Sequence, residues 1–221
     1  MTPNQVTVAR VAAAFAAVAL FIFCGASPFA GFAGVALTIA AIALDALDGY
    51  LARSRRLATP LGAQLDILGD RVVENLFFTF FAVAGLISLW IPILFFVRGT
   101  VTDFLRSLAA RSGRIGFGSS GMHRSWWARA LVASRWSRAA YASLKCICFC
   151  ILGLLVSLAH APREWLAQPV HAALVSSAQV VVALTVGFCL FRAIPVFWEG
   201  RRYLAPVAQP SRTARVAEAS R

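Results

Sequence analysis

The chain has 221 residues, of which 60% are hydrophobic and 14% charged, and its mean hydropathy is +0.75. This composition excludes an ordinary soluble domain, because its long apolar segments would need more polar cover than the chain supplies. The formal net charge is +12, but the arginines flank apolar segments and form no recognisable nucleic-acid-binding module. We therefore expect an integral membrane protein with no nucleic acid partner.

Apolar segments recur along the chain at lengths that suit membrane-spanning helices. We predict an all-α, polytopic fold with about six transmembrane helices, at roughly 5–25, 30–52, 63–87, 89–111, 138–159 and 170–197. The apolar run after Asp70 is too long for one helix, and Ile91-Pro92 after Gly85 predicts a break in it. The first segment lacks a clear small-residue cleavage site, which favours a retained helix over a signal peptide.

The distribution of arginines predicts the orientation in the membrane. The loops 53–62 and 107–137 and the segment after 197 hold 13 arginines, whereas the opposite loops hold only Arg163. The positive-inside rule then places both termini at the cytoplasmic face. We expect one membrane domain over 1–204, followed at 205–221 by a basic tail whose small, polar composition is typical of disorder.

Negative charge is concentrated in one short stretch, from Asp45 to Asp70. The chain has nine acidic residues, and four of its five aspartates are Asp45, Asp48, Asp66 and Asp70. The first two share a helix face at the end of the second predicted helix, and the last two share a face at the start of the third. A short loop between antiparallel helices would bring these faces together. The repulsion among four carboxylates predicts protonation or bound hard cations such as Mg²⁺ or Mn²⁺.

Small and basic residues lie between these carboxylates. Gly49, Ala52 and Gly62 allow close approach of a ligand, and Arg53 is a fork-shaped donor that suits phosphate. Carboxylates, cations and an arginine together favour phosphoryl-group chemistry.

The stretch resembles the signature of the CDP-alcohol phosphotransferase family, D-x2-D-G-x2-A-R-x8-G-x3-D-x3-D, with all eight fixed residues at the expected spacing. The resemblance implies transfer of a phosphatidyl group from CDP-diacylglycerol to an alcohol, with release of CMP. It also implies a site at the cytoplasmic face of a bacterial-type inner membrane, and a homodimer.

The resemblance further assigns roles to the signature residues. Asp45, Asp48, Asp66 and Asp70 would hold Mg²⁺ or Mn²⁺, as two ions. Asp70 would also remove the proton of the acceptor hydroxyl. The cytidine diphosphate moiety would lie against Gly49, Ala52, Arg53 and Gly62.

The acceptor is less strongly indicated than the donor. The opening Pro3-Asn4-x-Val-Thr7-x-x-Arg10 and the segment Arg98 to Gly113 resemble bacterial phosphatidylglycerophosphate synthases, which favours glycerol 3-phosphate. Ser134-Arg135-Trp136 is similar to a Gly-Lys-Trp-Lys segment of the same synthases. The chain departs from them at Arg71, where Lys is usual, at Gly99, where an acidic residue is usual, and at Ser134 and Ser137, which replace the glycine and the second lysine of that segment. Asp70-Arg71-x-x-Glu74 is more similar to inositol-phosphate-using relatives. We expect the acceptor phosphate at Arg98, Arg106 and Arg135, with Arg138 and Lys145 as further cations.

Two other hypotheses belong to different classes of protein. A transporter with an acidic cation site would spread its carboxylates across the membrane depth, whereas these cluster at one side. A non-catalytic scaffold that kept the motif is the second, and the complete set of signature residues argues against it.

Overall fold

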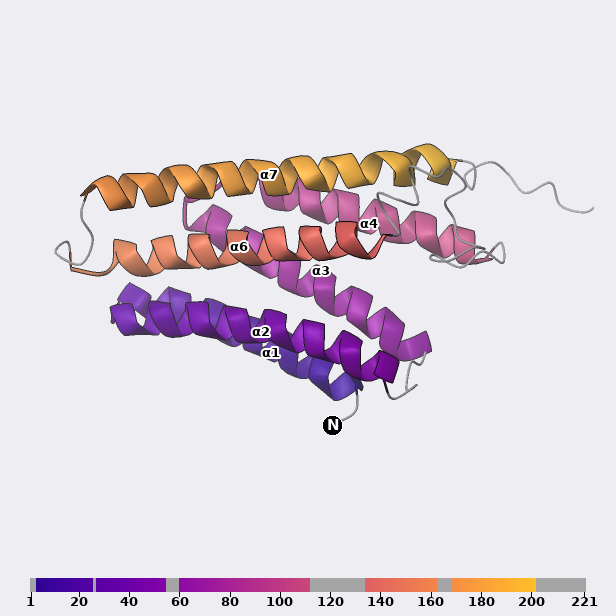
Figure 1. The fold of residues 1–221 in the computed structure, drawn as a ribbon, viewed down its shortest axis with the longest axis horizontal. Coiled ribbons are helices and arrows are strands. Elements are labelled where there is room, and N and C mark those ends of the chain that lie inside the picture. The colour runs from indigo at the N-terminus through magenta and orange to yellow at the C-terminus, as the bar shows by residue number, and fades with distance from the viewer. Residues whose placement is uncertain (1–2, 26, 55–59, 112–133, 163–167, 202–221) are drawn as a thin grey trace, which may run out of the picture.

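The computed structural model describes residues 3–25, 27–54, 60–111, 134–162 and 168–201. Within these ranges the description leaves out the side chains of residues 3, 4, 24, 45–54, 60, 61, 63, 110, 111 and 135. These residues form an all-α fold (Figure 1). Its elements are α1 (Pro3–Ile22), the 3₁₀ turn η1 (Phe23–Gly25), α2 (Pro28–Ser54), α3 (Pro60–Val83), α4 (Trp90–Arg111), α6 (Arg135–Ala159) and α7 (Gln168–Gly200). Each of the six predicted segments coincides with one α-helix, so the predicted all-α fold is confirmed.

Local sequence signals explain where these helices begin. Proline occupies the first helical position of α1, α2 and α3, where its fixed φ suits the helix and its missing N–H costs no hydrogen bond. Ser134 caps α6, and its hydroxyl accepts a hydrogen bond from the backbone N–H of Ser137 at 3.1 Å. The predicted break between the third and fourth helices is a turn with Gly85 at φ 76°.

Helix α3 connects two halves of the bundle. It begins beside α1 and crosses obliquely to reach α4, as Figure 1 shows. On one side α1 packs against α2, and α2 against α6; on the other, α6 packs against α7, and α7 against α4. One face of α3 therefore meets α1 while another meets α4.

Aromatic rings fill the centre of the bundle. The Phe78 ring lies 4.2 Å from that of Phe95 between centroids, and the Phe77 and Phe149 rings are 4.9 Å apart. Burial of such rings fixes the packing of α3 against α4 and α6. The charged residues of α3 lie nearer its N-terminus than these rings. The helix segment that carries the charges is therefore continuous with one that is packed in the apolar core.

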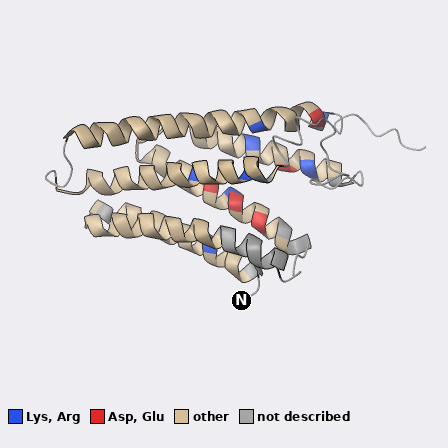
Figure 2. Ribbon diagram, viewed as in Figure 1, with Lys and Arg blue, Asp and Glu red and all other residues tan. Residues whose placement is uncertain are grey.

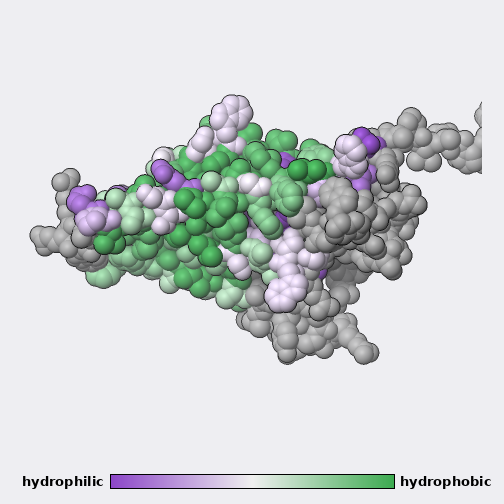
Figure 3. All heavy atoms as spheres, turned by 45° about the horizontal axis from the view of Figure 1, so that its top comes forward, coloured by the Kyte–Doolittle hydropathy of each residue, from purple (hydrophilic) through white to green (hydrophobic). Residues whose placement is uncertain are grey.

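Among the described residues, three helices are long and apolar enough to cross a membrane: Gln5–Ile22, Trp136–Ala159 and Gln168–Gly200. The apolar part of α2, Pro28–Leu44, is shorter, and the other described helices, α3 and α4, carry several charges. Six spans, and the side on which the termini lie, therefore stay predictions. Much of the described surface seen in Figure 3 is apolar. In Figure 2 the charged residues of the described helices lie away from the left-hand end of these helices. This polarity is typical of a membrane protein with a site at one end.

Candidate active site

The signature residues lie at the end of α2 and the start of α3. Asp45, Asp48, Gly49, Ala52 and Arg53 belong to the last turns of α2, but their side chains lie outside the description. Gly62, Asp66 and Asp70 belong to the first turns of α3. Of the four carboxylates predicted to converge, the structure describes only those of Asp66 and Asp70, so their convergence with Asp45 and Asp48 stays a prediction.

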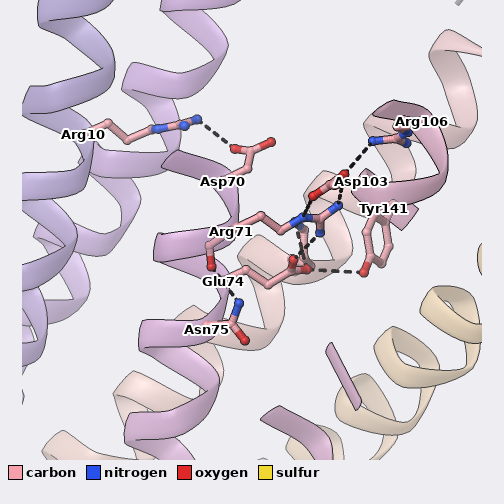
Figure 4. Close-up of polar contacts among 9 residues, drawn as sticks. Arg10, Asp70, Arg71, Glu74, Asn75, Asp103, Arg106 and Tyr141 are labelled. Atoms are coloured by element: carbon pink, nitrogen blue, oxygen red, sulfur yellow. Dashed lines mark hydrogen bonds and ion pairs between the residues drawn. The ribbon is translucent and has the colours of Figure 1, made fainter. Parts of the chain in front are cut away.

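Asp66 and Asp70 are bridged by one arginine from α1. Arg10 places Nη1 2.9 Å from Asp70 Oδ1 and Nη2 3.4 Å from Asp66 Oδ1 (Figure 4 shows the Asp70 contact). Nη2 also donates to the Asp66 backbone carbonyl at 3.3 Å. The Arg10 side chain is 4% exposed, while those of Asp66 and Asp70 are 53% and 51% exposed. The guanidinium thus supports the two carboxylates from the protein interior.

A glycine makes room for this guanidinium. A Cβ at Gly69 would lie 2.7 Å from Arg10 Nη2 and 3.1 Å from a Thr7 methyl. Helices α1 and α3 approach closely here because position 69 has no side chain.

Arg71, which follows Asp70 on α3, extends toward α4 rather than toward α1. Arg71 Nε donates to Asp103 Oδ2 of α4 at 2.9 Å, and Nη1 lies 3.0 Å from Glu74 Oε2 (Figure 4). Arg106 joins the same Asp103 at 3.3 Å. A Cβ at Gly99 would lie 3.2 Å from Arg71 Cδ and Nε, so the glycine lets Arg71 pass over α4.

Tyr141 of α6 is surrounded by cations. Lys145 Nζ lies 4.9 Å from the ring centroid, and the Cζ atoms of Arg192 and Arg98 lie 5.5 Å and 6.0 Å from it. Lys145 also pairs with Glu74 Oε1 at 3.3 Å, and Glu74 is only 2% exposed. We call this group around Tyr141 the basic cluster; its cations are Arg71, Arg98, Arg106, Lys145 and Arg192, and its carboxylates are Glu74 and Asp103.

The basic cluster has more cations than carboxylates. Arg98 is 9% exposed, and the Nε atom of Arg98 and the hydroxyl of Thr102 have no hydrogen-bond partner among the described residues. Buried donors without partners are rare, because each costs the desolvation of a polar group. The excess positive charge and the unsatisfied Nε of Arg98 together favour an anion as ligand.

A small cavity lies between the two charged groups. Its volume is about 60 Å³, and Arg10, Asp70, Glu74 and Lys145 supply its charged lining. Asp70 and two members of the basic cluster, Glu74 and Lys145, therefore line the same cavity. A larger cavity of about 790 Å³ is bordered by the turn at Gly85 to Ser88 and by apolar residues of α6 and α7. The two cavities share no lining residue, and no Asp, Glu, Lys or Arg lines the larger one, so we do not assign chemistry to it.

Two of the three arginines expected to bind the acceptor phosphate lie in the basic cluster, and the third has no described side chain. Arg98 and Arg106 belong to the basic cluster, though Arg106 is held by Asp103. Arg135 begins α6, and its side chain lies outside the description. Neither Arg10 nor Arg192 is among the residues to which the sequence pattern assigns a role. Both interrupt apolar helices, and an arginine inside an apolar span is the signal that would have found them.

The donor set is suited to a hard cation but is only partly described. Asp66 and Asp70 offer carboxylate oxygens one helical turn apart, which suits Mg²⁺ or Mn²⁺. Among the described side chains, no group of three or more His, Cys, Asp or Glu could hold a metal ion. The other two expected ligands, Asp45 and Asp48, fall outside those side chains.

Fold and site together define an all-helical membrane protein with an acidic pair and a basic cluster at one end. The chain matches the CDP-alcohol phosphatidyltransferase family over residues 1–198. It therefore belongs to that family, as its signature predicted.

Two curated proteins are similar to part of the chain. The cardiolipin synthase (CMP-forming) of Oryza sativa subsp. japonica is 39% identical over 71 residues, which is 32% of this chain and 21% of the relative. The CDP-diacylglycerol–glycerol-3-phosphate 3-phosphatidyltransferase of Rickettsia bellii (strain RML369-C) is 38% identical over 71 residues, 32% of this chain and 38% of the relative. The matched region thus spans about a fifth and about two fifths of these relatives.

Proposed function

We propose that the protein transfers the phosphatidyl group of CDP-diacylglycerol to a phosphorylated alcohol, with glycerol 3-phosphate as the preferred acceptor. Membership of the CDP-alcohol phosphatidyltransferase family supports the reaction class. The relative from Rickettsia bellii, whose name includes glycerol 3-phosphate, supports the acceptor. The observation that carries the proposal is the basic cluster around Tyr141, in which Arg98 is 9% exposed and Lys145 lines the cavity that Asp70 also lines.

In this proposal the basic cluster binds the acceptor, and Asp70 of the acidic pair acts as the base. The basic cluster would hold the acceptor phosphate, with Arg98 as its principal donor. This orients the acceptor hydroxyl toward Asp70, which takes its proton. The acceptor oxygen then bonds to the phosphorus that carries the diacylglycerol, and the bond from that phosphorus to the CMP oxygen breaks. CMP leaves with the electron pair.

Two divalent cations would be held by Asp66 and Asp70 of α3 together with Asp45 and Asp48 of α2. When bound, they would neutralise the diphosphate of the donor and polarise its P–O bonds. Gly49, Ala52, Arg53 and Gly62 would accommodate the cytidine diphosphate moiety.

The same proposal includes the membrane setting. The excess of arginines in the loops 53–62 and 107–137 and after 197 supports an active site at the cytoplasmic face of a bacterial-type inner membrane, with six spans and both termini inside. We also propose a homodimer, as the family resemblance implies.

Inositol phosphate is the second candidate acceptor. The favouring observation is Glu74, which lies buried between Arg71 and Lys145 and accepts a hydrogen bond from Tyr141 at 3.4 Å. A carboxylate at the edge of the cavity suits hydrogen bonding to a polyol ring.

The test is release of CMP by purified protein with CDP-diacylglycerol and Mg²⁺ or Mn²⁺. Glycerol 3-phosphate, inositol phosphate, inositol, serine and choline are supplied one at a time, with Asp70→Asn as the control. We expect turnover with glycerol 3-phosphate and none with the control. Turnover with inositol phosphate alone would move the proposal to the second acceptor. Turnover with choline or serine alone would contradict the role of the basic cluster.

A further inference from the structure

Arg10 differs from an ordinary buried ion pair in how it meets its partners. Its guanidinium reaches both Asp66 and Asp70, and also the carbonyl of Asp66. Both carboxylates stay about half exposed, while the guanidinium is buried. Glu74, by contrast, is 2% exposed, and its partners Arg71 and Lys145 are 21% and 20% exposed. The two carboxylates at Arg10 are therefore more accessible to a ligand than Glu74 is.

The geometry leaves the acidic pair open on the side away from Arg10. The guanidinium lies between α1 and α3, where Gly69 admits it, and Asp70 borders the small cavity. A single positive charge between two carboxylates also leaves the group with net negative charge. The pair can therefore attract a divalent cation while the arginine stays in place.

We propose that Arg10 is a positioning residue that holds Asp66 and Asp70 in the geometry required to bind a divalent cation. This inference rests on the proposed metal site. The fork of the guanidinium fixes the distance between two carboxylates one helical turn apart, which a point charge does less well. Partners of metal ligands typically contribute 10–100-fold to metal affinity.

The experiment measures Mn²⁺ affinity by electron paramagnetic resonance, on purified protein without substrates. Arg10→Met keeps the apolar stem and removes the fork, and we expect Mn²⁺ affinity to fall about 10–100-fold. Arg10→Lys should recover part of the loss. Arg192→Met, which removes an equally buried arginine from the basic cluster, should bind Mn²⁺ nearly as the wild type does.

A second variant separates positioning from folding. Gly69→Ala retains every charge and suits a helix better than glycine, but its Cβ would lie 2.7 Å from Arg10 Nη2. Because the guanidinium is the movable end of the Arg10 side chain, we expect it to shift and Mn²⁺ binding to weaken, while thermal stability stays close to that of the wild type. This combination would not arise if Arg10 only held α1 against α3.

Each other result counts against the inference. Unchanged Mn²⁺ affinity in both Arg10→Met and Gly69→Ala would make Arg10 a purely structural residue. Tighter binding in Arg10→Met would make it a competitor of the metal. A wild-type protein that binds no Mn²⁺ would overturn the metal site and the role of Arg10 with it. Loss of binding in Asp70→Asn but not in Arg10→Met would overturn only the role of Arg10.

Discussion

Two arginines cross helix interfaces at neighbouring points of α3, and their surroundings differ. Arg10 comes from α1, passes Gly69 and reaches Asp66 and Asp70, which remain half exposed. Arg71 leaves α3, passes Gly99 and reaches Asp103 on α4, inside a cluster with more cations than carboxylates. The region around Arg10 has two half-exposed carboxylates and one cation, so it carries accessible negative charge. The region around Arg71 has more cations than carboxylates, so it carries net positive charge. One helix would thus present the proposed cation site and the proposed anion site on adjacent faces, which suits the proposed reaction between a metal-bound diphosphate and a phosphorylated acceptor.

The strongest way to break this comparison is to neutralise Asp70, which borders both regions. Asp70→Asn should lower turnover by at least about 10²–10⁴-fold, because general-base catalysis contributes that much. Its thermal stability should remain close to that of the wild type, since the side chain is half exposed. CMP release and a melting curve on the same preparation check both points. Near-normal turnover would remove Asp70 from the role of base.

Arg98 tests the anion side alone. Arg98→Met should raise the KM for a phosphorylated acceptor about 10–100-fold, because a charge-assisted hydrogen bond contributes about 1.5–3 kcal/mol. The KM for CDP-diacylglycerol should hardly change. Steady-state kinetics with each substrate varied in turn provide the measurement.

A matched control for this variant is Arg201→Met, which removes an arginine that lies over the Trp198 ring at the end of α7, outside the basic cluster. It should leave both KM values near those of the wild type. Equal effects of the two variants would indicate loss of general positive charge rather than of a phosphate ligand.

Asp103 tests what holds the basic cluster together. Asp103→Asn weakens the pairs with Arg71 and Arg106, whose side chains are 21% and 26% exposed. Because the pairs are partly exposed, we expect a loss of roughly 1–3 kcal/mol in stability, below the 3–5 kcal/mol of a fully buried pair. Thermal unfolding in detergent measures it. A variant as stable as the wild type would show that the apolar rings of α3 and α4 suffice to join these helices.

The sequence predicted the helices and the signature well, for identifiable reasons. Long apolar runs and prolines at helix starts mark the elements, and the aspartates Asp66 and Asp70 share a face because of their i,i+4 spacing. The partner of that face was not predictable. Arg10 and Asp70 are 60 residues apart, and only the packing of α1 on α3 brings them together. The same holds for Arg192, which reaches Ser137 and the Tyr141 ring through the packing of α7 on α6.

One departure from the expected pattern has a structural explanation. The bacterial phosphatidylglycerophosphate synthases that the segment Arg98 to Gly113 resembles usually have an acidic residue where this chain has Gly99. Arg71 lies across this glycine, and its acidic partner is Asp103, one turn further along α4. A sequence comparison by position alone does not reveal such a shift, because the contact depends on the space that a missing side chain leaves.

The smallest effects are expected from replacing Gly99 or Gly69 by alanine. These two variants test most directly whether the α1 side and the α4 side of α3 act separately. Gly99→Ala places a Cβ 3.2 Å from Arg71 Cδ and Nε, so the side chain must shift by a few tenths of an ångström. We expect a change of about two- to fivefold in the KM for the acceptor, well below the effect of losing a charge-assisted hydrogen bond. Mn²⁺ affinity should stay at the wild-type value. Gly69→Ala should show the reverse pattern, with weaker Mn²⁺ binding and an unchanged KM for the acceptor. If both alanines altered both quantities alike, the two faces of α3 would form one coupled site, and the division between cation and anion sites would fail.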